Sequence, residues 1–121
     1  MAITTTEVDA TDLTAFQMQC LRVMGATGGD YGLGIKRELE ARYGEEVNHG
    51  RLYPNLDDLV QSGLVEKSEI DRRTNGYELT EKGQFVLVDE LGAFFEDVAG
   101  FSGHHALEVE GFAVDFEEVD E

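Results

Sequence analysis

The chain has 121 residues and a formal net charge of −17, with 26 acidic side chains against nine basic ones. This length suits one domain with a terminal extension, and a hydrophobic content of 41% excludes a wholly disordered chain. No apolar run approaches the roughly 18 residues that a membrane span needs, and the polar N-terminus does not resemble a signal peptide. With a single cysteine, the sequence predicts a cytoplasmic protein without an internal disulfide.

The acidic residues are spread over the whole chain, whereas every Lys and Arg lies between Arg22 and Lys82. Lysine is scarce, and this pattern is typical of proteins adapted to molar intracellular salt. At about 1 M salt, repulsion between carboxylates is screened over about 3 Å. The alternative is an acidic protein from an ordinary cytosol.

The first half of the chain predicts two helices. One runs from Asp12 or Thr14 to about Thr27 and is ended by Gly28 and Gly29. Its apolar residues lie on more than one side, so it needs more than one packing partner. The second begins at Asp30, a good N-cap residue, and runs to Tyr43 before Gly44. Its predicted buried stripe consists of Tyr31, Ile35 and Leu39.

A third helix and a hairpin follow. The helix is expected to begin at Asn48 and end at Gly63, with Pro54 inside it near the N-terminal end. Residues 64–70 and 77–79 are predicted strands, and Asn75-Gly76 favours a tight hairpin turn between them. The helix is expected to bury Leu52, Leu56, Leu59 and Val60.

A fourth helix is expected from the Thr80 cap to about Ala99, with Gly100 as its stop. It is too apolar to stand alone, so we expect it to pack against a second copy of the chain. The last twenty residues show a strand-like alternation interrupted by Gly111. That segment could pair with an N-terminal strand around residues 3–6, or it could be mobile.

These elements predict a mainly α fold with a small β-hairpin, that is, a winged helix-turn-helix with a C-terminal dimerisation helix. Residues 12–83 would form the winged-helix DNA-binding domain, and residues 84–100 the dimerisation helix, which packs with the first helix. Residues 1–11 and 101–121 would be acidic extensions with short strands. A helix that enters a DNA groove beside a hairpin that touches the backbone requires this order of parts.

Five segments together carry a family resemblance: Tyr31-Gly32, Glu38-Leu39, Leu52-Tyr53-Pro54-Asn55-Leu56, Gly63-Leu64-Val65 and the run from Tyr77 to Gly83. The chain resembles PadR-type winged-helix transcription regulators over about residues 14–95. With its acidic composition it is similar to haloarchaeal members, which implies work at high salt in the oxidative-stress response. The resemblance implies a homodimer held by the first and fourth helices, with the third helix in the major groove. The chain departs from the family in its negative charge, in Asp57 and Asp58, and in its tail.

The candidate base-reading residues are Arg51 and Asn55, which are four residues apart on the third helix. They lie opposite Leu52 and Leu56, so we expect them to project together away from the core. Arginine reads guanine and asparagine reads adenine through two-point hydrogen bonds. His49, at the exposed N-terminal end of the helix, is a further candidate.

Other candidate contacts are to the DNA backbone. The resemblance favours a phosphate contact for Tyr53, whose ring could instead pack at the domain edge. Arg72 and Arg73 at the hairpin tip could reach phosphate or the minor groove. Lys36 and Arg37 could hold the backbone from the second helix, or could simply pair with acidic residues four positions away.

The residues expected at the dimer interface are apolar positions of the first and fourth helices. Cys20 is interpreted as a buried, inert thiol rather than a redox sensor, with Arg22 as the only nearby cation. His104-His105 is a weak metal signal, so neither a metal site nor a cofactor is predicted. The predicted interface consists of Phe16, Cys20, Leu87, Leu91, Phe94 and Val98.

The sequence holds no catalytic motif, because adjacent Asp57 and Asp58 point about 100° apart on a helix and cannot form an acid–base couple. The expected partners are double-stranded DNA with two half-sites and a second copy of the chain. Bound cations are expected between phosphates and acidic residues such as Asp57, Asp58, Glu45 and Glu46. The alternative is a winged-helix module that binds protein instead of DNA.

Overall fold

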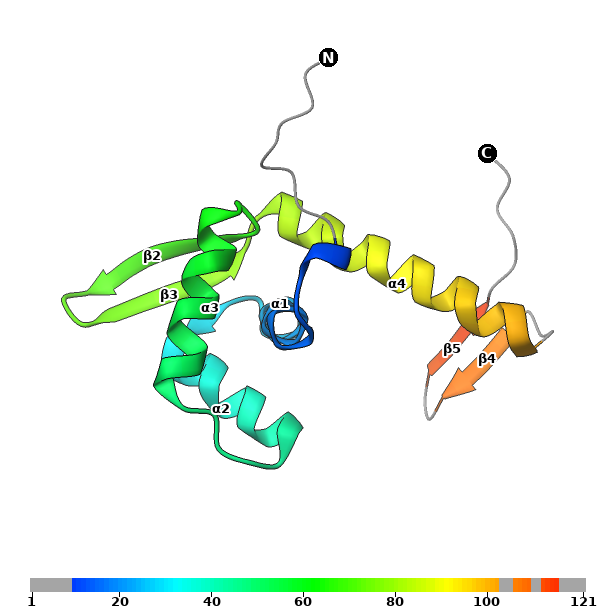
Figure 1. Cartoon of the computed structure of the whole chain (residues 1–121), viewed down its shortest axis with the longest axis horizontal. Helices are drawn as coiled ribbons and strands as arrows, with labels where there is room; N and C mark the ends of the chain where they lie inside the picture. Colours follow the sequence, from blue (N-terminus) through cyan, green and yellow to red (C-terminus); the bar gives the residue numbers. More distant parts are fainter. Residues whose placement is uncertain (1–9, 103–105, 110–111, 116–121) are drawn as a thin grey trace, which may run out of the picture. The chain divides into compact units, whose positions relative to one another are not determined.

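The computed structural model describes residues 10–102, 106–109 and 112–115 (Figure 1). The described residues up to Leu87 form one compact unit, and those from Val88 onwards form a second, described separately. No helix in the described ranges is long and apolar enough to cross a membrane. The elements are a 3-10 turn (Ala10–Asp12), α1 (Ala15–Thr27), β1 (Asp30–Tyr31), α2 (Gly32–Tyr43), α3 (His49–Gln61), β2 (Val65–Asp71), β3 (Thr74–Leu79), α4 (Glu81–Ser102), β4 (Ala106–Val109) and β5 (Phe112–Asp115).

Helix α1 begins with a reciprocal cap, as its Thr-x-x-Gln sequence allows. The Thr14 hydroxyl accepts from the Gln17 backbone N–H at 3.1 Å, and the Gln17 side chain accepts from the Thr14 N–H at 3.1 Å. Two backbone donors that a helix start leaves open are therefore satisfied. The helix ends at Gly28, whose φ of 79° is the left-handed conformation that glycine adopts at little cost.

The expected start of α2 at Asp30 is wrong. Asp30 and Tyr31 instead form β1, which pairs antiparallel with β3 opposite Tyr77 and Gly76. Because these residues are held in the ladder, the helix begins at Gly32, and the Asp30 carboxylate accepts from the Tyr31 N–H at 2.7 Å. Tyr31 is 49% exposed and so lies outside the buried stripe. The three strands lie in the order β1-β3-β2.

The expected hairpin turn at Asn75-Gly76 is also wrong. These two residues lie inside β3 opposite Glu69 and Ser68, and the loop between the strands is Arg72-Arg73. The Asp71 carboxylate accepts from the Arg73 N–H at 2.9 Å, so a local side-chain bond stabilises this turn. A Cβ at Gly76 would lie 3.4 Å from the Ile70 side chain, so glycine relieves crowding within the strand.

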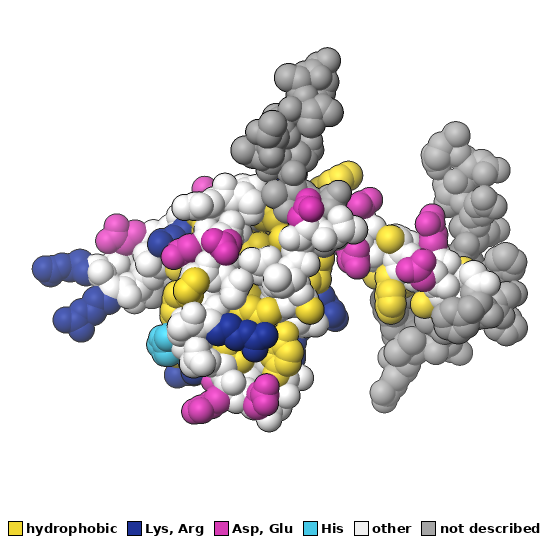
Figure 2. All heavy atoms as spheres, viewed as in Figure 1, with side chains coloured by type: hydrophobic (Ala, Val, Ile, Leu, Met, Phe, Trp, Pro, Cys, Tyr) yellow, Lys and Arg dark blue, Asp and Glu magenta, His cyan; other side chains and the backbone are white. Residues whose placement is uncertain are grey.

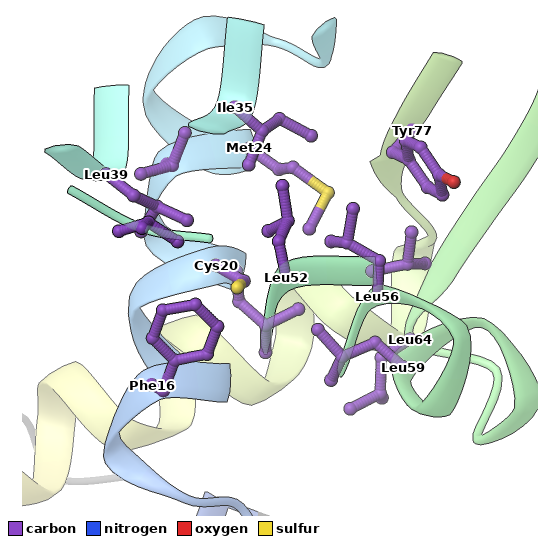
Figure 3. Close-up of a cluster of buried hydrophobic side chains, with 14 of the residues drawn as sticks. Phe16, Cys20, Met24, Ile35, Leu39, Leu52, Leu56, Leu59, Leu64 and Tyr77 are labelled. Carbon is purple, nitrogen blue, oxygen red and sulfur yellow. The ribbon is translucent and has the colours of Figure 1, made fainter. Parts of the chain in front are cut away.

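One hydrophobic cluster holds the first unit together. Leucines of α3 face Cys20 and Met24 of α1 and Ile35 of α2 in the core (Figure 3). Removing one such leucine side chain typically costs about 2–5 kcal/mol. The cluster therefore fixes the orientation of α3, with Leu52, Leu56 and Leu59 on its buried face.

Helix α4 has its N-terminal cap at Thr80, as the sequence predicts, because the Thr80 hydroxyl accepts from the Gly83 N–H at 3.1 Å. The expected stop at Gly100 is wrong, since the helix continues to Ser102. Gly100 is not among the glycines with positive φ, so it stays helical at a cost of about 1 kcal/mol relative to alanine. Val86 is buried in the first unit, so the start of α4 belongs to the winged part.

In the second unit, β4 pairs antiparallel with β5, with Leu107 opposite Val114 and Val109 opposite Phe112. The strand-like alternation on both sides of Gly111 therefore corresponds to a hairpin. The alternative partner around residues 3–6 lies outside the described residues.

Candidate nucleic-acid interface

Helix α3 presents a continuous outward face. The Asn48 side chain caps the helix by accepting from the Arg51 N–H at 2.8 Å, as the sequence predicts. Because the leucines fix the inner face, positions about 180° away point to solvent. Pro54 lies on this exposed side, where the unpaired carbonyl of the preceding turn can reach water. The exposed residues of this face are Gly50, Pro54, Asp57, Asp58 and Gln61.

Arg51 and Asn55 lie together on one flank of α3, but not opposite the buried leucines as the sequence predicts; Arg51 is exposed, yet both contact α1. The Arg51 guanidinium lies over the Phe16 ring, 4.0 Å from its centroid, and 5.9 Å from the Tyr43 ring. Asn55 is half-buried, and its side-chain oxygen accepts from Gln17 at 3.0 Å. Both residues lie on the flank of α3 that faces α1. Around the helix axis they are separated from the buried leucines by much less than 180°, so they do not lie on the opposite face.

Sequence reasoning missed Gln17. The Thr14-x-x-Gln17 capping pattern was readable, because a glutamine at the third helical position commonly completes a capping box. Its contact with Asn55, 38 positions away, has no local signal. The start of α1 is therefore part of the site.

His49 and Tyr53 lie on the other flank of α3, and their rings are 5.5 Å apart. His49 is exposed and Tyr53 is half-buried. A Cβ at Gly32 would lie 2.5 Å from the Tyr53 hydroxyl oxygen, so glycine lets this tyrosine lie against the start of α2. The packed ring matches the sequence alternative in which Tyr53 packs at the domain edge, and its contact with phosphate stays a prediction.

The hairpin of β2 and β3 carries two exposed arginines at its tip, Arg72 and Arg73. Figure 2 shows basic side chains at this projecting end. Neither guanidinium has an ion pair within the described residues. The backbone hydrogen bond from Arg73 lowers the pKa of Asp71, so this carboxylate keeps its charge and its turn-forming bond to acidic pH.

A hollow of about 420 Å³ lies between this hairpin, α3 and the start of α2. Three tyrosines contribute to its wall, with Arg73 and Asp71 at the hairpin side. The hollow connects the tyrosine flank of α3 to the wing. Its lining includes Tyr31, Leu33, Tyr53, Asp71, Arg73 and Tyr77.

The two basic residues of α2 differ in availability. Lys36 is half-buried and donates to Glu40 at 2.8 Å, which matches the alternative of pairing four positions along the helix. This hydrogen bond, followed by one from the Val47 N–H, lowers the pKa of Glu40. Arg37 is exposed and has no ion pair in the described part of the chain. Arg37 is therefore the freer candidate for a DNA phosphate.

Acidic side chains share the outward surface. Asp57 and Asp58 are exposed on α3, and Glu45 and Glu46 are exposed in the loop before it. Lys67 approaches Asp57 only to 3.8 Å, a weak exposed pair. Among the described residues, Asp58, Glu45 and Glu46 form no ion pair, so the surface that faces outward beside the arginines carries several carboxylates without a paired cation.

Two of the six expected dimer residues are corrected. Phe16 is 5% exposed and Cys20 is 0% exposed, both within the core of their own chain, so neither offers surface to a second copy. Leu87 packs against the same core, and Val98 is half-buried. The last two of the six expected residues, Leu91 and Phe94, are exposed. Phe85 and Val88 of the same helix, which are not among those six, are exposed as well.

Burial makes Cys20 a poor redox sensor. Loss of solvation raises the pKa of its thiol to about 12, and the nearby charge of Arg51, rather than the expected Arg22, lowers it only in part. A thiol that stays protonated at neutral pH is a weak nucleophile.

We expect a thiol-specific alkylating reagent to leave Cys20 unmodified in the folded chain and to modify it in denaturant, as measured by mass spectrometry. Because the pKa of the Cys20 thiol in the folded chain lies above its ordinary value of 9.0, the unfolded state ionises first as the pH rises. The contribution of Cys20 to stability is therefore intact below pH 9.0 and falls between pH 9.0 and about 12. Rapid alkylation of the native chain at neutral pH would contradict this assignment.

Within the described ranges, no group of three or more His, Cys, Asp or Glu is arranged to hold a metal ion. The weak signal at His104-His105 lies outside the described residues.

Residues 20–89 match the family described as "Transcriptional regulator PadR-like family". A structure of H. salinarum RosR grown from NaBr is 63% identical, with 74% of this chain and 80% of that chain covered and a TM-score of 0.71. A complex structure of hsRosR-S1 is 61% identical, covering 76% and 81% with a TM-score of 0.73. An E. coli MarR mutant complexed with operator DNA is 28% identical, covering 63% and 51% with a TM-score of 0.53. None of the curated proteins compared with the chain matches it.

Proposed function

Because the chain belongs to the PadR-like family of transcriptional regulators, we propose that it binds operator DNA as a homodimer, with α3 as the recognition helix and the β2–β3 hairpin as the wing. The observation that carries this proposal is the composition of one continuous surface. The outward face of α3 is flanked by Arg51 and Asn55 on one side and by His49 and Tyr53 on the other. The wing ends in two arginines that form no ion pair with any other described residue.

The proposed base reader Arg51 must leave the Phe16 ring of α1 to reach DNA. An exposed cation–π contact such as that between Arg51 and Phe16 is worth about 0.5–1 kcal/mol. A bidentate arginine–guanine contact is worth about 1–3 kcal/mol of discrimination. The free energy of the guanine contact is the larger of the two, so the loss of the Phe16 contact is offset when Arg51 binds a guanine.

The proposed backbone contacts come from three places. Arg72 and Arg73 would reach phosphate or the minor groove, and Tyr53 with Arg37 would meet phosphates beside the groove. Lys36 is a weaker candidate, because a DNA contact would break its hydrogen bond with Glu40. The similarity to a MarR mutant complexed with operator DNA supports DNA binding by a chain of this fold.

A second copy of the chain would bind the second half-site of the DNA. We propose that the exposed apolar side of α4 holds the dimer, and that the two recognition helices read half-sites about one helical turn, or 10 base pairs, apart. Work at high salt and a role in the oxidative-stress response belong to the same proposal. They are supported by the acidic composition and by the similarity to RosR.

The competing function is a winged-helix module that binds protein. A mobility-shift experiment with duplex DNA at molar KCl separates the two. A sequence-dependent shift supports the regulator, whereas a folded chain that shifts no duplex at any salt concentration would favour the protein-interaction module.

Two arginine substitutions should have different signatures. Arg51→Ala should cost about 1–3 kcal/mol on the operator and relax the preference at one base position, because it removes a base contact. Arg73→Ala should weaken all duplexes by a similar factor, since phosphate contacts carry little sequence information. Fluorescence anisotropy with operator and unrelated duplexes measures both. Equal losses for both variants on every duplex would contradict the placement of α3 in the groove.

A further inference from the structure

The first turn of α1 is connected to the recognition helix by a chain of hydrogen bonds. The Thr14 N–H donates to the Gln17 side-chain oxygen at 3.1 Å. The Gln17 amide nitrogen then donates to the Asn55 side-chain oxygen at 3.0 Å. The Asn55 amide nitrogen in turn donates to the Arg51 backbone carbonyl at 2.7 Å. We refer to these three bonds as the amide relay.

Both ends of the amide relay have a fixed polarity. A backbone N–H can only donate, and a backbone carbonyl can only accept. The Thr14 N–H therefore requires the oxygen of Gln17, which turns the Gln17 nitrogen toward Asn55. The Arg51 carbonyl likewise requires the nitrogen of Asn55. Only one orientation of each side-chain amide satisfies all three bonds.

The central bond of the relay is partly buried, and the two outer bonds are exposed. Gln17 and Asn55 are both half-buried, so water competes less for the bond between them than at an open surface. The neighbouring residue Phe16 carries the Arg51 guanidinium on its ring, so the same turn of α1 contacts both proposed base readers. The capping box that starts α1 thus also holds one flank of α3.

The relay leaves Asn55 with the groups that base readout needs. An asparagine amide has two N–H donors and an oxygen with two lone pairs, and the relay uses one donor and one lone pair. One of each remains, which is the combination that a two-point contact with adenine requires. Without the relay, the amide could exchange its oxygen and nitrogen positions and lose this preference.

We propose that Gln17 is a positioning residue for base readout: together with the Arg51 carbonyl, it fixes the orientation of the Asn55 amide and thereby contributes to the choice of adenine in the operator. This inference rests on the proposed function, because it assumes that Asn55 faces a base. It adds to that function a specificity-determining residue that lies outside the recognition helix.

The test compares three substitutions in the full-length chain. Gln17→Leu removes the two bonds of the relay that involve Gln17 and keeps the bond from Asn55 to the Arg51 carbonyl. Gln17→Glu keeps an acceptor for the Thr14 N–H, so the capping box survives, but it cannot donate to the Asn55 oxygen. Thr14→Ala is the matched control, because it removes the hydroxyl half of the cap at a cost of about 1 kcal/mol and keeps the backbone N–H that anchors Gln17.

The probes are a duplex that the wild-type chain selects from a randomised pool, the same duplex with single base pairs exchanged, and an unrelated duplex. The position read by Asn55 is the one at which Asn55→Ala loses its preference. There, both Gln17 variants should lose about tenfold in discrimination by fluorescence anisotropy. Affinity for the unrelated duplex should change little for Gln17→Leu, and Thr14→Ala should discriminate like the wild type.

A double substitution completes the test. In an Asn55→Ala background, Gln17→Leu should cause no further loss, since both act on one contact. The inference is overturned if the Gln17 variants keep full discrimination, if Thr14→Ala loses as much, or if Asn55→Ala changes no base preference. If the folded wild type distinguishes none of the duplexes, the proposed sequence-specific function fails first, and the inference fails with it.

Discussion

The affinity of the dimer for its operator should stay level or rise between about 0.1 and about 1 M KCl, unlike that of most DNA-binding proteins. An ordinary complex releases counterions from DNA, and its affinity falls steeply with salt. Here the outward surface carries exposed carboxylates at Asp57, Asp58, Glu45 and Glu46. Close to phosphates, these groups are tolerated only if cations lie between them. Cation uptake at the protein then opposes cation release from the DNA.

The combined substitutions Asp57→Asn and Asp58→Asn should restore a steep negative slope of log affinity against log salt and strengthen binding at low salt. The matched control is Asp89→Asn with Glu90→Gln, an exposed acidic pair on α4 with the same change in charge. Isothermal titration across the salt series measures the slopes. A steep loss of affinity for the folded wild-type dimer over this range would refute cation-mediated docking and leave the acidity a role in solubility alone.

Replacing Leu91 and Phe94 by glutamate should convert the protein to a monomer. These side chains are 50% and 59% exposed in the single chain, and burial of a large apolar side chain contributes about 1.5–3 kcal/mol. Sedimentation should give about twice 13.4 kDa for the wild type and 13.4 kDa for the variant. Because joining two half-site contacts raises affinity by about 10²–10⁴-fold, operator binding should fall by at least about 100-fold.

Asp97→Asn on the same helix is the control for this prediction, because it changes an exposed polar residue and leaves the apolar side intact. It should sediment and bind as the wild type does. A variant with both glutamates that remains dimeric, or a monomer that keeps full operator affinity, would contradict the role proposed for α4.

The sequence predicted those features that depend only on neighbouring residues in the chain. The caps at Thr14, Asn48 and Thr80 were readable because each uses a side chain within three residues of the N–H it satisfies. The buried leucines of α3 followed from helical spacing. The place of Arg72 and Arg73 at the wing tip followed from the two flanking strands.

The features that the sequence did not reveal depend on distant partners. β1 is two residues long, too short for a periodic pattern, and exists because β3 pairs with it. Asn75-Gly76 is a strong local turn signal, yet Gly76 lies within β3, where Ile70 leaves little room for a side chain. The contact of Asn55 with Gln17 required the packing of α1 against α3. Local propensity is overridden wherever tertiary pairing is stronger.

The most direct test of sequence-specific binding through the recognition helix is selection of duplexes from a randomised pool by the wild-type chain at molar KCl. We expect enrichment of two related half-sites about 10 base pairs apart, and loss of preference at defined positions of each half-site for Arg51→Ala and Asn55→Ala. A folded, dimeric sample that enriches no sequence over the starting pool would contradict the account.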